Sequence, residues 1–281
     1  MKKLLFFSIL LGSCVAGAQV PKVKHVVVIV EENHSFESVI GNSQMPFLNH
    51  LAHTYAYTSQ YFANTHPSLP NYFQLTTGQF ITTNDNFNGV TTADNVVREL
   101  DRFGLTWDDY AESIPFAGYT GKSVGQYLKR HNPFAFFSDV VTTPAQRSKM
   151  LGVPDFSEDL SANVLPNFAF VVPNRCDDAH DCSLGAADRW LRSQVSGLLT
   201  NPDFAKSGLL FIVFDEGAFS DHRHGGGRVA TVVAGTHVKR GFVSARFYQH
   251  QNLLRTALQA LGASRFPGAS ANAAPMSDLF Q

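Results

Sequence analysis

Four oxygen-bearing side chains follow two apolar runs of the sequence. They are Glu32, Asn33, Asp215 and Glu216. Carboxylates that are brought together repel one another unless a proton or a cation offsets their charge. Oxygen donors of this kind favour a hard divalent cation such as Mg²⁺, Ca²⁺ or Mn²⁺, and Zn²⁺ accepts them as well. A cation held there would polarise a phosphoryl oxygen and stabilise an alkoxide nucleophile, so these residues indicate metal-assisted phosphoryl chemistry.

A candidate nucleophile lies in the segment 64–72, where Ser68 stands between Pro67 and Pro70. The two prolines stiffen the backbone around the serine. A helix beginning near Asn71 would present its amino end, which favours an anion. A serine between prolines is also an ordinary turn or helix cap, so this segment alone does not assign the role.

The elements that must position these residues are marked by apolar runs in a chain of 281 residues. Four runs are apolar on both faces, as expected for strands of a sheet covered by helices. They span residues 26–30, 168–172, 209–214 and 229–234. Segments with helical spacing of apolar residues alternate with them, at 92–103, 183–199 and 248–261. The alternation predicts an α/β sandwich with a mostly parallel central sheet flanked by helices.

The strand ends predict where the chemistry lies. In an open parallel sheet, ligands bind beyond the carboxyl ends of the strands. The polar segments after runs 26–30, 168–172 and 209–214 should therefore meet at one edge, and the middle one contains His180. We also expect the aromatic residues around Trp107 and Tyr110 to pack in a lid or wall. No linker or repeat is evident, so residues 19–281 are predicted to form one catalytic domain.

The first 18 residues have the pattern of an export signal. Lys2 and Lys3 precede an apolar block, and a small-x-small cleavage pattern ends at Ala18. This pattern predicts a signal peptide over 1–18 and a secreted or periplasmic protein. A lipoprotein signal ending at Cys14 is a minor alternative. No later apolar stretch is long enough to cross a membrane.

Two cysteines remain after such a signal is removed, Cys176 and Cys182. In an oxidising compartment an isolated close pair is most simply a disulfide, because a zinc site would need further ligands nearby. The charges nearly cancel, with 22 basic and 23 acidic residues. We therefore expect no nucleic-acid partner.

Seven segments resemble, in order, a bacterial phosphoesterase family within the alkaline phosphatase superfamily. This family contains secreted acid phosphatases and phosphatidylcholine-type phospholipases C. The segments are 28–36, 66–72, 129–134, 173–182, 214–216, 225–227 and 250–256. Each segment alone is weak, whereas the ordered set is specific. The resemblance implies an alkaline-phosphatase-like sandwich, and the short chain is most similar to the small secreted acid phosphatases.

The resemblance also implies roles for individual residues. Ser68 matches the serine or threonine that attacks phosphorus. The metal-binding positions match Glu32, Asn33, Asp215 and Glu216, with Ser68 also facing the metal. The phosphate-contacting positions match Asn33, His131 and His180. One divalent metal is implied, although a second remains open through His180, Asp177, His222 and His224.

These observations predict a secreted, metal-dependent acid phosphatase that hydrolyses phosphomonoesters through a phosphoserine intermediate. His131 or His180, if protonated, would donate a proton to the leaving group, which predicts a mildly acidic optimum. The substrate would be a small-molecule or lipid-headgroup phosphate ester. The alternatives are a phospholipase C-type phosphodiesterase, a phosphoinositide-directed phosphatase and, outside the enzymes, a periplasmic binding protein.

Overall fold

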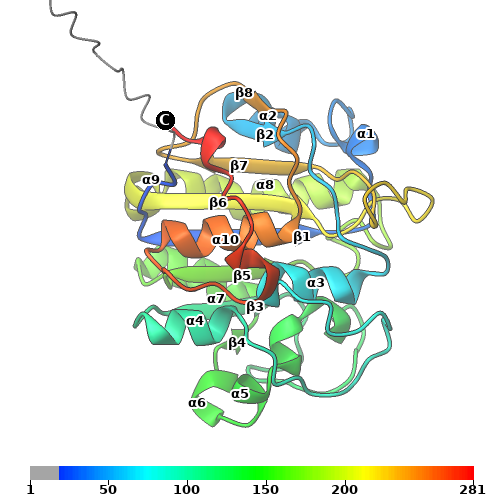
Figure 1. Cartoon of the computed structure of the whole chain (residues 1–281), viewed down its shortest axis with the longest axis vertical. Helices are drawn as coiled ribbons and strands as arrows, with labels where there is room; N and C mark the ends of the chain where they lie inside the picture. The colour runs from blue at the N-terminus through cyan, green and yellow to red at the C-terminus, as the bar shows by residue number, and fades with distance from the viewer. Residues whose placement is uncertain (1–18) are drawn as a thin grey trace, which may run out of the picture.

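The computed structural model describes residues 19–281, so the export signal expected over 1–18, with Cys14, lies outside the described residues. An eight-stranded sheet forms the centre, in the order β4-β3-β5-β1-β6-β7-β2-β8 (Figure 1). Its strands are β1 (His25–Glu31), β2 (Ala56–Thr58), β3 (Trp107–Ala111), β4 (Met150–Leu151), β5 (Phe168–Val172), β6 (Gly208–Phe214), β7 (Thr231–Gly235) and β8 (Phe242–Ser244).

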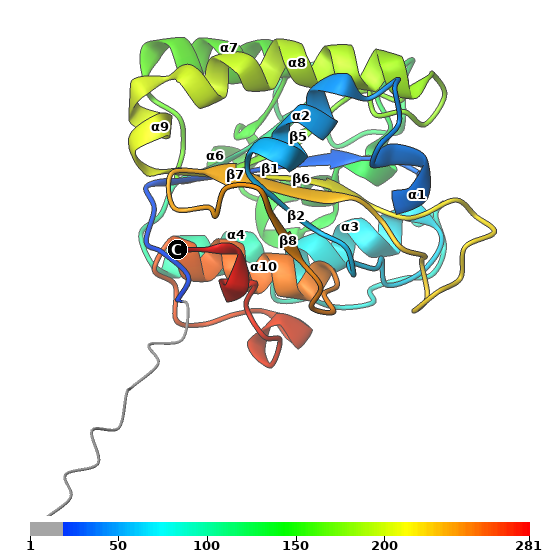
Figure 2. The ribbon, with the colours of Figure 1, turned by 90° about the horizontal axis from the view of Figure 1, so that it is seen from above.

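Helices cover both faces of this sheet. The α-helices are α1 (Phe36–Val39), α2 (Pro46–Thr54), α3 (Ser68–Thr77), α4 (Val96–Arg102), α5 (Ser138–Val141), α6 (Pro144–Arg147), α7 (Val153–Ala162), α8 (Leu184–Thr200), α9 (Pro202–Ser207) and α10 (His250–Ala260). Figure 2 shows α2, α7 and α8 on one face and α3, α4 and α10 on the other. The predicted α/β sandwich with a flanked, mostly parallel sheet is therefore confirmed.

Three of the predicted strands lie at the centre of the sheet. The runs 26–30, 168–172 and 209–214 form β1, β5 and β6, and β1 pairs in parallel with the other two. The run 229–234 overlaps β7, which pairs antiparallel with β6. The central strands are apolar on both faces because helices bury both sides of them. Their side chains belong to the hydrophobic core.

Strand register brings the predicted polar ends together. Glu31 of β1 is paired with Phe214 of β6, so the residues that follow them leave the sheet side by side. Those residues are Glu32 and Asp215. Successive side chains of a strand point to opposite faces. The side chains of Glu31 and Glu32 therefore point to opposite faces of the sheet.

The region around Trp107 differs from the expected lid or wall. Trp107 and Tyr110 lie in β3, which pairs in parallel with β5, and both side chains are buried. Two consecutive aspartates within this strand conceal its apolar pattern in the sequence. One of them, Asp109, is fully buried, and Asp108 is half-buried.

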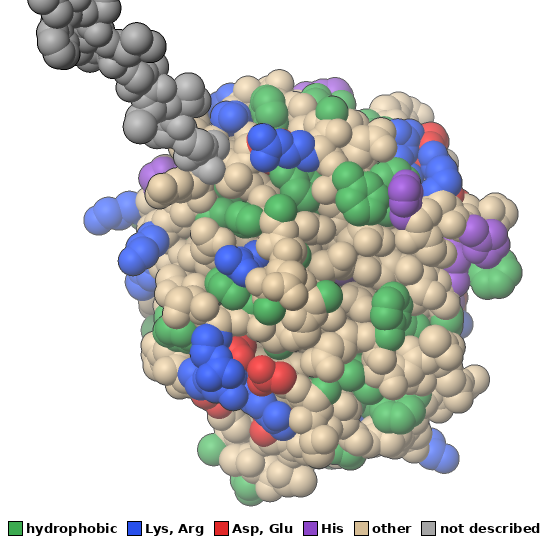
Figure 3. Space-filling model, in the orientation of Figure 1, with side chains coloured by type: hydrophobic (Ala, Val, Ile, Leu, Met, Phe, Trp, Pro, Cys, Tyr) green, Lys and Arg blue, Asp and Glu red, His purple; other side chains and the backbone are tan. Residues whose placement is uncertain are grey.

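Basic side chains form small separate groups on the face shown in Figure 3, and the largest group lies beside acidic side chains. Both arginines of α4 form ion pairs with acidic side chains, Arg98 with Asp139 and Arg102 with Glu99. Within residues 19–281, no helix is both long and apolar enough to cross a membrane.

Candidate active site

Ser68 is the first residue of α3 and follows the cis peptide bond between His66 and Pro67. Its side chain is buried, and its Oγ lies 3.0 Å from Glu32 Oε2 and 3.2 Å from Glu216 Oε1. One hydroxyl hydrogen can serve only one of these carboxylates at a time. Either a proton or a cation must therefore relieve the repulsion between the oxygens around Ser68.

Three side chains lie against the carboxylate of Glu32, and two of them donate hydrogen bonds to it. Besides the contact with Ser68, the hydroxyl of Tyr72 donates to Glu32 Oε1 over 2.8 Å. His131 Nε2 lies 3.2 Å from the same oxygen. Burial is the main cause that raises the pKa of Glu32 well above its usual value, and the charges of Asp215 and Asp178 add to it.

Asp215 follows β6 and faces the same space. Backbone N–H groups of Asn33 and Glu216 donate to its Oδ1 over 3.2 and 2.6 Å. Its Oδ2 is buried and has no hydrogen-bond partner in the described residues. Burial, with the neighbouring charge of Glu216, raises the pKa of Asp215 well above its usual value. Asn33 adopts φ = 61°, in the left-handed region that asparagine tolerates better than most residues.

This donor set fits a hard divalent cation. The oxygens of Glu32 and Glu216 share the hydroxyl of Ser68, and Asp215 offers an oxygen without a partner. Buried carboxylates this close are costly without a counter-charge. Carboxylate, amide and hydroxyl oxygens suit Mg²⁺, Ca²⁺ or Mn²⁺.

His131 lies at the end of a short 3₁₀ helix, Lys129–His131, and is buried. Its ring stacks on Tyr72 at a centroid distance of 5.2 Å, and Nδ1 lies 3.2 Å from Asp178 Oδ2. Burial, with the charge of Arg130, lowers the pKa of His131 well below its usual value. Burial therefore favours the neutral form of His131.

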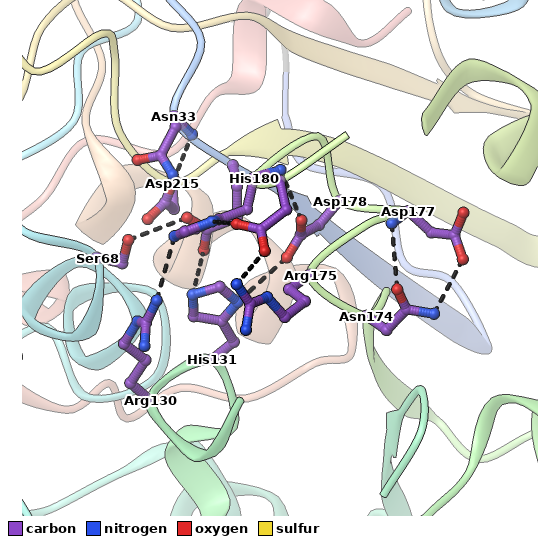
Figure 4. Close-up of polar contacts among 12 residues, drawn as sticks. Asn33, Ser68, Arg130, His131, Asn174, Arg175, Asp177, Asp178, His180 and Asp215 are labelled. Carbon is purple, nitrogen blue, oxygen red and sulfur yellow. Dashed lines mark hydrogen bonds and ion pairs between the residues drawn. The ribbon is translucent and has the colours of Figure 1, made fainter. Parts of the chain in front are cut away.

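His180 reaches the site from the loop after β5, as Figure 4 shows. Arg130 lies 3.1 Å from its Nε2, and Asp181 lies 2.6 Å from its Nδ1. Because a guanidinium can only donate, Nε2 accepts this bond and the ring proton resides on Nδ1. In this arrangement His180 is neutral.

Glu32, His131 and His180 offer ligand atoms that all lie within 4.8 Å of one another. A second cation position that shares Glu32 is thus geometrically compatible with this structure. The other three residues considered for a second metal have other contacts. Asp177 accepts from Asn174 over 2.9 Å, the His224 ring packs on Phe62, and the His222 ring packs on His66.

The loop that carries His180 is closed by the predicted disulfide between Cys176 and Cys182. Between the cysteines, Asp178 accepts from the backbone N–H of His180 over 2.8 Å and contacts His131. The carbonyl of Asp178 also accepts from the backbone N–H of Glu32 over 2.8 Å. The disulfide loop therefore connects three of the predicted site residues.

Several supporting residues were not assigned from the sequence. His66 Nδ1 lies 2.6 Å from Glu216 Oε2, and its Nε2 lies 2.9 Å from the carbonyl of Asp221. One ring nitrogen thus holds Glu216 while the other fixes the ring to the backbone of Asp221, and the bond to Glu216 raises the pKa of His66. His250 Nε2 similarly donates to the carbonyl of Asp215 over 2.7 Å.

The structure brings all the predicted site residues to one edge of the sheet. Tyr72 had a detectable signal, since it lies one helical turn after Ser68 and therefore on the same helix face. Asp178, Arg130 and His66 had no comparable signal, because their roles depend on contacts between distant loops.

The chain is similar to known proteins over most of its length. Residues 42–262 match the model of the Phosphoesterase family. The matched range includes Ser68, His131, His180 and Asp215, and it begins after Glu32 and Asn33.

Two curated relatives illustrate the similarity. A phosphatidylinositol-3-phosphatase of Mycobacterium tuberculosis is 35% identical over 269 residues, which cover 94% of this chain and 85% of the relative. A phosphate-repressible acid phosphatase of Penicillium chrysogenum is 32% identical over 79% of this chain. The chain spans about half the length of that fungal relative, with 55% covered.

Solved structures share the fold at low sequence identity. An alkaline phosphatase superfamily protein from Vibrio parahaemolyticus superposes with a TM-score of 0.62 at 13% identity, over 88% of this chain and 68% of that one. The murine ectonucleotide pyrophosphatase/phosphodiesterase 5 superposes with a TM-score of 0.58 at 11% identity, over 92% of this chain and 100% of that one.

Proposed function

The chain belongs to the Phosphoesterase family, and from that premise we propose that it is a secreted, metal-dependent acid phosphatase. It hydrolyses phosphomonoesters, with Ser68 as the nucleophile. The observation that carries this proposal is the position of Ser68 Oγ at the start of α3, within 3.2 Å of two carboxylates. Relatives named acid phosphatases and a phosphatidylinositol-3-phosphatase support monoester chemistry.

Ser68 Oγ attacks phosphorus while the ester oxygen departs on the opposite side, so one P–O bond forms and one breaks. The hydroxyl proton passes to the carboxylate of Glu32 or Glu216. The amino end of α3 adds a partial positive charge beside the phosphoryl oxygens. Water then cleaves the phosphoserine, which releases phosphate and restores Ser68.

A divalent cation, when bound, would neutralise charge on the phosphoryl oxygens and lower the pKa of the serine hydroxyl. The residues that would hold it are Glu32, Asn33, Ser68, Asp215 and Glu216. Asn33 and the two histidines contact the phosphate in this proposal. His180 is the better candidate for the acid, because it is partly exposed whereas His131 is buried. To act as the acid it must first take up a proton on Nε2, which displaces the hydrogen bond from Arg130.

Ser68→Ala tests the proposal with p-nitrophenyl phosphate as substrate, before and after chelation and metal re-addition. We expect a loss of kcat of at least about 10³-fold, since removing a nucleophile costs that much or more in serine enzymes. Acid quenching of the wild type should trap a phosphate on Ser68, detectable by mass spectrometry. Ser157→Ala, an exposed serine of α7, is the matched control.

An unchanged rate in Ser68→Ala would overturn the assignment of the nucleophile. A rate that is insensitive to chelation would overturn metal dependence. Faster hydrolysis of bis-p-nitrophenyl phosphate than of the monoester would favour the phosphodiesterase alternative.

One second candidate is narrower, namely a phosphatase directed at phosphoinositides. It is favoured by the Mycobacterium tuberculosis relative, because the similarity covers nearly the whole of both chains. Release of phosphate from short-chain phosphatidylinositol 3-phosphate, compared with p-nitrophenyl phosphate, tests this candidate.

A further inference from the structure

A pocket of about 400 Å³ lies beside the candidate active site and has no role in the chemistry described above. Its wall includes residues from three separate segments. Those that matter here are Asp85, Asn88, Lys122, Lys129, Arg130 and Phe136. A volume of this size holds a ligand as large as a phosphorylated ring.

The pocket is joined to the active site through two of its lining residues. Arg130 contacts both the pocket and Nε2 of His180, over 3.1 Å. Asp85 accepts from the backbone N–H of Leu69, the residue after Ser68, over 3.1 Å. The leaving group of an ester attacked by Ser68 therefore has this pocket within reach.

The charge of the pocket is positive. It has three cationic side chains, Lys122, Lys129 and Arg130, against one carboxylate. That carboxylate, Asp85, already forms an ion pair with Arg130 over 3.0 Å. Neither Lys122 nor Lys129 has a carboxylate within ion-pair distance in the described part of the chain.

Lys129 is the more buried of the two lysines. Its Nζ lies 3.0 Å from Asn88 Oδ1 and 4.7 Å from the centre of the Phe136 ring, so its neighbours are neutral. A half-buried ammonium with only neutral neighbours lacks a counter-charge, and an anion would supply it.

We propose that this pocket is a subsite for a second anionic group, and that the substrate is a phosphomonoester whose leaving group carries a further phosphate. The proposal rests on the function proposed above and narrows its substrate class. The monoester phosphate lies at Ser68, and the second phosphate lies between Lys122 and Lys129. Two kinds of compound carry a monoester phosphate and a second anionic phosphate group. One is a soluble bisphosphate, and the other is a phosphoinositide headgroup, in which the second group is a phosphodiester.

Matched substrates test this subsite. Inositol 3-phosphate carries one phosphate, inositol 1,3-bisphosphate carries two, and short-chain phosphatidylinositol 3-phosphate carries a phosphodiester in the second position. For the wild type we expect kcat/KM to be at least 10-fold higher for the bisphosphate than for the monophosphate, mainly through KM. The lipid arm distinguishes the two sources: a value well above that of the soluble bisphosphate identifies a headgroup in a lipid.

Lys129→Met and Lys122→Met should each lower this ratio of kcat/KM values at least 5-fold. The ratio is the informative readout, because any general damage to the site cancels in it. Lys206→Met, an exposed lysine of α9, is the matched control and should keep the wild-type ratio. Two lysines on different segments guard against a local folding defect in either variant.

Failure of the subsite and failure of the proposed phosphatase function give different experimental outcomes. Activity on the monophosphate with a ratio near 1, or a ratio unaffected by both lysine variants, overturns the subsite alone. Absence of phosphate release from every substrate, p-nitrophenyl phosphate included, overturns the proposed function. In that event calorimetric titration with inositol 1,3-bisphosphate still tests the subsite, because its affinity must fall at least 5-fold in Lys129→Met.

Discussion

Tyr72 donates to one oxygen of the Glu32 carboxylate, and Ser68, one turn earlier on α3, donates to the other. The proposed nucleophile and the group that orients its partner therefore lie on the same face of one helix. Tyr72 itself does not need to touch substrate. It acts as a positioning residue whose effect passes through Glu32.

Tyr72→Phe removes only this hydrogen bond. A hydrogen bond to a charged group is worth about 1.5–3 kcal/mol, so we expect kcat/KM to fall about 10- to 100-fold. The concentration of divalent metal that gives half-maximal activity should also rise, which a purely structural role would not produce. Tyr110→Phe is the matched control, since that tyrosine also donates to a carboxylate, Asp159, but lies in β3. An unchanged metal requirement in Tyr72→Phe contradicts the positioning role.

Removal of metal should destabilise the protein. Asp215 and Glu32 are buried carboxyls whose raised pKa reflects the cost of their burial. A divalent ion at 100 times its Kd would add about 2.7 kcal/mol of stability. For a chain of this size we expect a chelator to lower Tm by about 5 °C or more, measured by calorimetry.

Asp215→Asn should abolish the dependence of stability on metal. Loss of one buried charge should leave the metal-free variant at least as stable as the metal-free wild type, while added metal no longer raises its Tm. Asp139→Asn, which alters a carboxylate paired with Arg98 instead, should keep the wild-type response to metal. If Asp215→Asn still gained stability from metal, Asp215 would not be a ligand.

Asp108 gives a pH dependence that is independent of the site. Burial, followed by the charge of Asp159, raises its pKa to about 7. A raised pKa in the folded state means that the stabilising contribution is complete below the unfolded value, near pH 4. It is lost as pH rises through about 7. Asp108→Asn should therefore match the wild type at pH 4 and exceed its stability at pH 8.

Because Asp108 remains partly in contact with solvent, we expect a gain of about 1–2 kcal/mol at pH 8. Urea unfolding at the two pH values measures it. The exposed Glu158→Gln on α7 serves as the control. Equal stability of Asp108→Asn and the wild type at both pH values would show that this carboxyl does not titrate with folding.

We expect the disulfide between Cys176 and Cys182 to matter more for activity than for stability. A closed loop this short contributes about 2 kcal/mol in the chain-entropy model. Replacing both Cys176 and Cys182 with serine should therefore cost a modest part of the stability. It should lower kcat/KM about 10-fold, because Asp178 and His180 lose their fixed positions. Phosphate turnover that is insensitive to the replacement would refute this connection.

The central strands were predictable because the chain buries them on both faces. The runs at β1, β5 and β6 consist of apolar residues without interruption, so their type and their shared edge follow from the sequence. The strands nearer the edges of the sheet could not be predicted from the sequence in this way. In β3 two aspartates stand beside Trp107, and β2 and β8 are only three residues long.

Some of the site residues were likewise predictable from the sequence, and others were not. Glu32 and Asp215 follow central strands, so their proximity follows from strand order. Ser68 required the family resemblance, because a serine between prolines carries little information. The contacts of His66 with Glu216, and of Arg130 with His180, join loops far apart in the chain. No local pattern encodes such contacts.

The end of β1 limits how the chain can vary in length. Glu32 points toward Ser68, whereas Glu31 is buried on the other face, where neither of its oxygens has a hydrogen-bond partner in the described residues. Inserting or deleting one residue before this end would exchange the two glutamates. Parallel partners on both sides prevent β1 from slipping to compensate. Functional variants in an insertion scan should therefore be depleted throughout β1, even though many of its positions accept other apolar residues.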